Sequence, residues 1–179
     1  NNSMTVEQYI QNVLLGGGVS ISNVQYNGGT ASINNEQVGS FNDPNSHIGL
    51  ASGLNLGTLG YTHCCIEDLS IMRSIPNLTV LSPADCLETA KALEDSLNHN
   101  ESVYIRLTGT SNAPMVYEDD YDFKIGKPIE IIKGKEIVIF ATGSMVYNSI
   151  EATKILNSSN IFPSVINIHT LKPIDKKTI

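Results

Sequence analysis

The chain has 179 residues, 41% of them hydrophobic and 16% charged, so it is long enough and apolar enough to bury a core in one or two domains. Its 11 Lys and Arg against 18 Asp and Glu give a formal net charge of -7, with no basic face of the kind that nucleic acid needs. No apolar run approaches the roughly 18–20 residues of a membrane helix, and the Asn-rich start is not typical of a signal peptide. We therefore expect neither a nucleic-acid nor a membrane partner.

The N-terminal segment, residues 1–53, differs in composition from the rest of the chain. Asn, Gly and Ser dominate it, and every Lys and Arg of the protein lies at or after Arg73. A short helix is predicted from Thr5 up to three consecutive glycines, which favour left-handed backbone conformations. The alternation in VSISNVQY (19–26), a turn at NGG and the returning TASI (30–33) predict a β-hairpin. We therefore expect a β-rich segment.

A strand followed by a helix is predicted from residue 77 onward. NLTVLS (77–82) is a short apolar strand. We expect Ser82 to be the N-cap of the following helix, with Pro83 at its first position and Asp85 completing a capping box. Four apolar side chains at helical spacing are expected to form its inward face: Leu87, Ala90, Leu93 and Leu97.

The remaining segments repeat this alternation. Strands are predicted over SVYIRL (102–107), EIVIFATG (136–143) and PSVINIHTL (163–171), and a helix over VYNSIEATKIL (146–156). The continuous apolar run in 136–143 is typical of a buried parallel strand, and the acidic cluster at 118–122 is expected to be a solvated loop. Together these elements predict an α/β fold with right-handed crossovers and doubly wound parallel sheets.

Candidate functional residues are sought at strand-to-helix turns, because open α/β sheets bind ligands there. His63 precedes a helical pattern, and its imidazole is either a cleft residue or a structural one. Arg106 stands in an otherwise apolar strand, so its guanidinium must pair with an acid or bind an anion such as phosphate. Neighbouring Glu67 and Asp68 are interpreted as charges that complement the helix dipole. ATGS (141–144) is interpreted as a tight turn rather than a phosphate-binding loop.

The three cysteines favour a reducing compartment. Cys64 and Cys65 are adjacent, and with Cys86 they make neither a metal-binding spacing nor an even disulfide set. We therefore expect reduced, mostly buried thiols, no metal site and a cytoplasmic location.

The stretch GTLGYTHCCIEDLSIMRSIPNLTVLSPADCLETAKAL (57–93) resembles the transketolase family in three successive motifs. These are a G-x-T-H loop, an E-D-x-x-x-x-R-x-x-P-N helix exit and a P-A-D-x-x-E helix start, and VYIRL and INIHTLKPID continue the likeness. It is strongest to the small-subunit, or C-terminal-section, transketolases. The resemblance implies a partial pyrimidine-binding domain over 54–117, followed by a linker and a partial C-terminal domain over 118–179.

The resemblance also implies roles for two residues. His63 matches the histidine of the Thr-His loop, which lies over the thiamine thiazolium and assists proton transfers on the substrate. Arg106 is the candidate for the arginine that holds a sugar phosphate at the end of the strand after the P-A-D helix. Transketolases often have Asp-Gly-Pro ahead of Thr-His, where this chain has Leu59, Gly60 and Tyr61, so a contact to a substrate hydroxyl is missing. The identity of the sugar stays open.

The cofactor implied by the resemblance is thiamine diphosphate with magnesium, with which the family moves a two-carbon ketol unit between sugar phosphates. The G-D-G motif that binds the magnesium diphosphate does not occur in this sequence, and neither does the upstream glutamate that activates the aminopyrimidine. We therefore expect a diphosphate-binding domain or subunit to complete the site, in an enzyme that is a dimer when complete. The isolated chain is expected neither to bind the cofactor nor to be active.

Residues 1–53 resemble the opening of the choice-of-anchor L domain of secreted bacterial surface proteins. They stand where the first half of a pyrimidine-binding domain is expected, which leads to the hypothesis of a chimeric chain joined near residues 51–56. Three rival interpretations follow: a relative of deoxyxylulose-phosphate synthase or of the 2-oxo acid dehydrogenase β subunit, a secreted surface or adhesion module, and a non-functional chimeric fragment.

Overall fold

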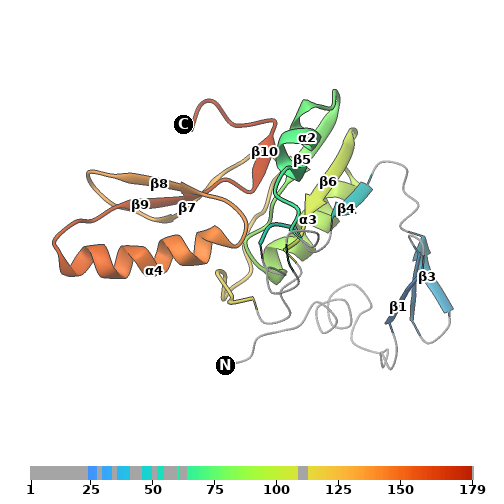
Figure 1. Cartoon of the computed structure of the whole chain (residues 1–179), viewed down its shortest axis with the longest axis horizontal. Helices are drawn as coiled ribbons and strands as arrows, with labels where there is room; N and C mark the ends of the chain where they lie inside the picture. Colours follow the sequence, from blue (N-terminus) through green and yellow to red (C-terminus); the bar gives the residue numbers. More distant parts are fainter. Residues whose placement is uncertain are drawn as a thin grey trace.

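The computed structural model describes residues 24–27, 30–33, 36–40, 46–49, 52–54, 60, 64–108 and 113–178. In this part of the chain the strands form three sheets, in the orders β1-β2-β3, β10-β5-β6-β4 and β7-β9-β8 (Figure 1). Helices α2, α3 and α4 accompany the second and third sheets. The α/β class expected from the sequence is confirmed, with mixed rather than purely parallel sheets.

The first sheet contains the predicted hairpin. Strand β1 (Val24–Asn27) pairs antiparallel with β2 (Thr30–Ile33), and β3 (Glu36–Ser40) pairs antiparallel with β2 on its other side. The helix predicted from Thr5 lies outside the described residues.

The second sheet has three parallel strands and one antiparallel strand. Strand β6 (Ser102–Arg106) lies between β5 (Leu78–Leu81) and β4 (Ser46–Gly49), which confirms the strands expected near 77–82 and 102–107. Strand β10 (Thr170–Lys172) adds to the other edge of β5. Because β4 pairs with β6, residues 46–49 of the predicted N-terminal segment 1–53 belong to this α/β sheet.

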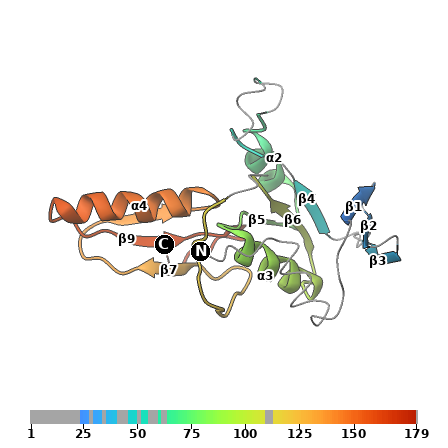
Figure 2. The ribbon, with the colours of Figure 1, turned by 90° about the horizontal axis from the view of Figure 1, so that it is seen from below.

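Helices α2 (Asp68–Ser74) and α3 (Cys86–Leu97) lie on opposite faces of this sheet (Figure 2). Side chains alternate between the two faces of a strand, so β5 and β6 contribute to two separate cores. The core on the α3 side contains Leu81, Ala92, Val103, Ile105 and Phe123, and the core on the α2 side contains Leu78, Val80 and Tyr104.

Two details of α3 correct the sequence prediction. Its N-cap is Asp85, whose side chain accepts a hydrogen bond from the Glu88 N–H, and Ser82 lies outside the helix. Leu97 is 70% exposed, whereas the buried positions are Glu88, Thr89, Ala90, Ala92 and Ser96. The inward face is therefore more polar than the apolar spacing predicts. The reason is that the helix also contacts the polar segment 116–125, called the linker below.

Asp85 ties that linker to the start of α3. One carboxylate oxygen, Oδ1, accepts the Glu88 N–H at 2.8 Å. The other, Oδ2, accepts the backbone N–H groups of Val116 and Tyr117 at 2.8 and 2.9 Å. A single buried carboxylate thus caps the helix and fixes the chain that leaves the second sheet.

Glu88 joins α3 to the third sheet. Its fully buried carboxylate accepts hydrogen bonds from Asn167 Nδ2 at 2.8 and 3.0 Å and from the Ala84 N–H at 2.6 Å. The hydroxyls of Tyr117 and Tyr121 donate to its Oε1 at 3.3 and 3.1 Å. Five contacts from three chain segments therefore converge on one side chain.

The third sheet carries α4 (Met145–Ser158), which confirms the helix predicted at 146–156. Strand β8 (Val138–Ala141) is parallel to β9 (Ser164–Asn167), and β7 (Ile129–Ile132) is antiparallel to β9. The strand predicted within 136–143 is confirmed as β8, parallel to β9, but its expected burial is wrong. Among the described residues β8 is the edge of this sheet, and two of its side chains, Val138 and Phe140, are 49% and 46% exposed.

The predicted strand 163–171 divides between two sheets. It pairs with β8 up to Asn167, and from Thr170 it pairs with β5 of the second sheet. Between them, the Ile168 N–H donates to the Ala141 carbonyl and the His169 carbonyl accepts from the Ser82 N–H. The crossing links the two sheets by continuous backbone, in addition to the Glu88 contacts.

We predict a pH dependence of stability that originates in Glu88. Burial outweighs the surrounding hydrogen bonds and raises the pKa of Glu88 from 4.5 to about 7. Between these values the folded chain holds a proton that the unfolded chain has released, so this group's contribution to stability should fall as the pH rises and level off above about pH 7. Burial lowers the pKa of His169 from 6.5 to about 4, so that group contributes stability that rises with pH over much of the same range. The free energy of unfolding of the native chain minus that of Glu88→Gln, measured by denaturant unfolding, cancels the His169 contribution and should fall across this pH range.

The matched control is Glu94→Gln, which changes an exposed glutamate on the same helix. It should keep the pH profile of the native chain. Parallel profiles for the native chain and Glu88→Gln would contradict the prediction.

Candidate active site

The sequence-predicted Arg106 is the last residue of β6, at the carboxyl end of the parallel strands. Its Nε–H donates to Asp68 Oδ2 at 2.8 Å, and the two side chains are 14% and 4% exposed. The structure therefore pairs the arginine with an acid, one of the two alternatives that its apolar strand leaves open. Asp68 is the first residue of α2, where its charge complements the helix dipole as expected. Its carboxylate is in addition the partner of the arginine.

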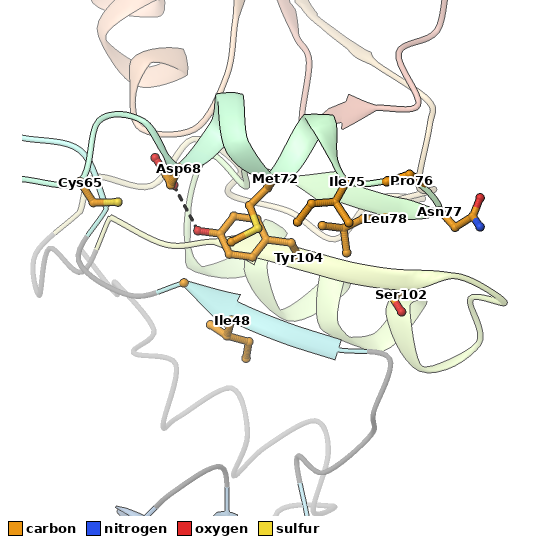
Figure 3. Close-up of a pocket in the computed structure, with 11 residues that line it drawn as sticks. Ile48, Cys65, Asp68, Met72, Ile75, Pro76, Asn77, Leu78, Ser102 and Tyr104 are labelled. Carbon is orange, nitrogen blue, oxygen red and sulfur yellow. Dashed lines mark hydrogen bonds between the residues drawn. The ribbon is translucent and has the colours of Figure 1, made fainter.

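Tyr104 holds the same carboxylate from a second direction. It lies two residues before Arg106 in β6, so both side chains leave the same face of the sheet, the face that α2 covers. Its hydroxyl donates to Asp68 Oδ2 at 3.2 Å (Figure 3). The alternation along the strand signals that Tyr104 and Arg106 share a face, but the acid 38 residues away is brought there only by the fold.

Two glycines make room for these side chains. Gly49 of β4 pairs with Arg106, and a Cβ at Gly49 would clash with the Tyr104 hydroxyl. Gly53 has φ +82, which favours glycine, and a Cβ there would lie 3.3 Å from Arg106 Nη2. Glycine backbone, without a side chain, therefore lies beside the Tyr104 hydroxyl and the Arg106 guanidinium.

The electrostatics of the site keep Asp68 ionised at neutral pH. Burial by itself would raise the pKa of Asp68, but the hydrogen bond and charge of Arg106, helped by the Tyr104 hydroxyl, outweigh burial and hold the pKa below its ordinary value. Burial and the neighbouring carboxylate raise the pKa of Tyr104, so its hydroxyl stays a donor.

A groove of about 710 Å³ runs between α2 and the sheet, with Asp68 and Tyr104 in its lining (Figure 3). Its walls are mainly apolar and include Ile48, Met72 and Leu78. Such a groove accepts an apolar or aromatic group and offers polar contacts from the carboxylate and the hydroxyl.

The other sequence candidates have different outcomes. His63 lies outside the described residues, so its predicted role stays a prediction. In the turn 141–144, the Gly143 N–H donates to the Ser82 carbonyl at 3.1 Å and is occupied by this contact. This supports a tight turn. The acidic stretch 118–122 is a loop whose residues are mostly exposed, as expected.

The cysteines, all three of which are described, form no disulfide. The expectation that they are mostly buried is wrong: Cys65 is exposed, and Cys64 and Cys86 are half-buried. Among the described residues no group of three His, Cys, Asp or Glu side chains is placed to hold a metal ion. Nor does this part of the chain contain a helix with the length and hydrophobicity to span a membrane.

Comparison with known families assigns both halves of the described α/β region. Residues 38–113 match the pyrimidine-binding domain of transketolase, and residues 126–179 match the transketolase C-terminal domain. The chain belongs to the transketolase family. The pyrimidine-binding match begins at residue 38, ahead of β4, in agreement with the pairing of β4 and β6, and it contains Asp68, Tyr104 and Arg106.

Two curated relatives are transketolase subunits. The chain is 32% identical to an apulose-4-phosphate transketolase subunit from Phocaeicola vulgatus, over 74% of this chain and 42% of the relative. It is 37% identical to the 6-deoxy-6-sulfo-D-fructose transketolase subunit SqwH from Clostridium sp., over 83% of this chain and 43% of the relative. The chain thus spans less than half the length of these transketolase subunits.

The fold also matches a solved transketolase. An inactive β4 tetramer of a split-gene transketolase superimposes with a TM-score of 0.67 at 34% identity, over 74% of this chain and 42% of that one. The arrangement of the second and third sheets is therefore a transketolase arrangement.

We predict that the ion pair stabilises the fold. Arg106→Met would leave Asp68 as an unpaired buried charge, which should lower the free energy of unfolding by about 3–5 kcal/mol. Replacing both residues, in Asp68→Leu with Arg106→Met, should cost less than Arg106→Met alone. Denaturant unfolding measures both effects.

The control is Arg73→Met, which removes the other arginine, exposed in the last turn of α2. It should change the free energy of unfolding by no more than about 0.5 kcal/mol. An equal loss for Arg73→Met and Arg106→Met would show that the buried pair contributes nothing.

Proposed function

We propose that this chain is part of a thiamine-diphosphate-dependent transketolase that moves a two-carbon ketol unit between sugar phosphates in carbohydrate metabolism. One observation carries the proposal: Arg106 stands at the carboxyl end of β6, inside the pyrimidine-binding match, held by Asp68 through Nε. A cation at the ligand-binding end of a parallel sheet is suited to a phosphorylated substrate.

Arg106 would hold the phosphate of the sugar through its terminal amino groups. A guanidinium is always charged at physiological pH and offers donors in a planar fork that matches phosphate geometry. Binding of the phosphate, remote from the reacting carbons, would orient the ketose for carbon-carbon cleavage. His63, assigned only by the resemblance of its Thr-His loop, would assist proton transfers at the substrate oxygens.

The described site fits the substrate phosphate and not the metal end of the cofactor. Around Arg106 the nearest charged partner is the already paired Asp68, a donor set that suits an anion rather than Mg²⁺. Thiamine diphosphate, when bound, would stabilise the carbanion left on the transferred unit. We propose that its magnesium diphosphate is held by a diphosphate-binding domain or subunit outside this chain.

The relatives support this division of the site between chains. Both are named as subunits, and the solved split-gene transketolase is an inactive β4 tetramer. We propose that this chain likewise needs a partner subunit, in an assembly whose complete form is dimeric.

A calorimetric titration with thiamine diphosphate and Mg²⁺ tests the proposal. Heat is expected when a diphosphate-binding transketolase subunit is present with this chain, beyond that of the subunit alone, and none with this chain alone. Binding by the chain alone would contradict the proposed division, and no added heat in the mixture would contradict the partner role. Turnover of a 2-oxo acid in place of a ketose phosphate would favour the deoxyxylulose-phosphate synthase or 2-oxo acid dehydrogenase interpretation.

We further predict a phosphate-specific defect in the assembled enzyme. Arg106→Met should lower kcat/KM by about 10- to 100-fold for a ketose phosphate, as expected for a lost charge-assisted hydrogen bond, and leave an unphosphorylated ketose nearly unaffected. Steady-state kinetics at a temperature where the variant is folded measure this, with Arg73→Met as the control. Equal losses for both substrates would contradict a phosphate role for Arg106.

A further inference from the structure

We propose that Glu88 is a proton-controlled joint between the two domains of the chain: a proton on its carboxyl group keeps α3 and the third sheet together, and loss of that proton loosens their contact while each sheet keeps its own fold. The joint connects the pyrimidine-binding match, residues 38–113, with the C-terminal match, residues 126–179. Helices α2 and α3 lie on opposite faces of the second sheet, so the joint is separate from the Asp68–Arg106 pair and does not depend on the function proposed for it (Figure 2).

The first argument is the place of the acid. Glu88 and Asn167 are both fully buried, and the Asn167 amide, at the end of β9, donates to the two Glu88 oxygens at 2.8 and 3.0 Å. This side-chain contact spans the boundary between the two domains. A charge on the carboxyl group destabilises the closed joint, because only an open joint exposes the group to water. The protonation state of Glu88 therefore changes the strength of the contact.

The second argument is that no cation offsets a charge on Glu88. Among the described residues Glu88 forms no ion pair, and the titratable side chains that interact with it are Asp85, Tyr117 and Tyr121. Lys91 lies near the Tyr121 ring, but its ammonium group pairs with Asp120. Ionised Glu88 thus depends on neutral donors, and Asp85 adds repulsion. The side chains that β7, β8 and α4 contribute beside the joint are apolar: Ile131, Ala141, Val146 and Ile150.

The third argument is that the cluster can accommodate the proton without movement of a heavy atom. The hydroxyls of Tyr121 and Tyr117 lie 3.1 and 3.3 Å from Glu88 Oε1. A phenol donates or accepts according to the rotation of its hydroxyl, so a protonated Oε1 can donate to either oxygen. The Asn167 amide and the Ala84 N–H keep their acceptors in this state. Protonation therefore removes the buried charge and preserves the contacts between the domains.

The raised pKa of Glu88 sets the direction of the effect. This pKa is about 7 in the folded chain, where burial outweighs the hydrogen bonds, against 4.5 for an exposed glutamate. Between these values the closed joint holds a proton that an open joint releases. The ratio of closed to open joints should therefore fall by about tenfold for each pH unit up to about pH 7, and change little above it.

Native-state hydrogen exchange of the full chain, followed by NMR from about pH 5 to about pH 8, provides the test. The reporter is the Gly143 N–H, which donates across the joint to the Ser82 carbonyl at 3.1 Å. Its protection factor, corrected for the intrinsic exchange rate at each pH, should be lower than that of amides in the β5–β6 ladder. It should also fall by about tenfold per pH unit up to about pH 7.

The variant Glu88→Gln is neutral at every pH and removes the effect. The ratio of the native protection factor to that of Glu88→Gln cancels other buried titrating groups such as His169, and this ratio should show the whole fall. Glu94→Gln, at an exposed position of the same helix, should behave as the native chain does. Equal pH profiles for the native chain and Glu88→Gln would overturn the proposal. So would a Gly143 protection factor equal to that of the ladder amides at every pH, because the joint would then open only when the whole chain unfolds.

A second measurement needs no variant. The side-chain carboxyl carbon of Glu88 in the native chain, followed by carbon NMR, should titrate near pH 7, over the same range in which the Gly143 protection falls. A midpoint near the ordinary value of 4.5 would show that the closed joint holds no proton at neutral pH, which would also overturn the proposal.

Discussion

The buried carboxylate of Glu88 is the interaction on which the arrangement of the two α/β sheets depends. A charge or a carboxylic acid without partners is costly in a protein interior, so the chain must bring donors to it. Here the donors come from the start of α3, from the tyrosines of the linker and from Asn167 at the end of β9. Satisfying one side chain therefore fixes the second sheet, the linker and the third sheet relative to one another.

The P-A-D-x-x-E motif acquires a structural meaning from this network. Its aspartate caps α3 and holds the backbone of the linker, and its glutamate reaches the neighbouring domain. The motif follows the carboxyl end of β5, the end of the second sheet at which Arg106 lies. A motif identified through family resemblance is thus explained by hydrogen bonding between domains, while the residues proposed to meet the substrate lie elsewhere.

The Arg106 site shows a different use of buried charge. Glu88 receives its donors from neutral groups and its pKa is raised, whereas Asp68 faces a guanidinium and its pKa is lowered. The first arrangement suits a joint between domains. The second keeps a fixed negative charge beside a fixed positive one, which suits a site that must hold an arginine in one direction. Both follow from the balance between desolvation and the charge of the partner.

Elements whose signals are local could be predicted from the amino-acid sequence alone: the hairpin of β1 and β2, strands β5 and β6, helix α4, the transketolase motifs, and the need of Arg106 for a partner or an anion. Tertiary structure decided what depends on groups far apart in the chain. It chose Asp68 as that partner, Asp85 over Ser82 as the cap and a polar inner face for α3, and it divided 163–171 between two sheets. The physical reason is that hydrogen-bond satisfaction and burial are set by neighbours in space. Local periodicity records which side chains share a face, but not which segment will cover it.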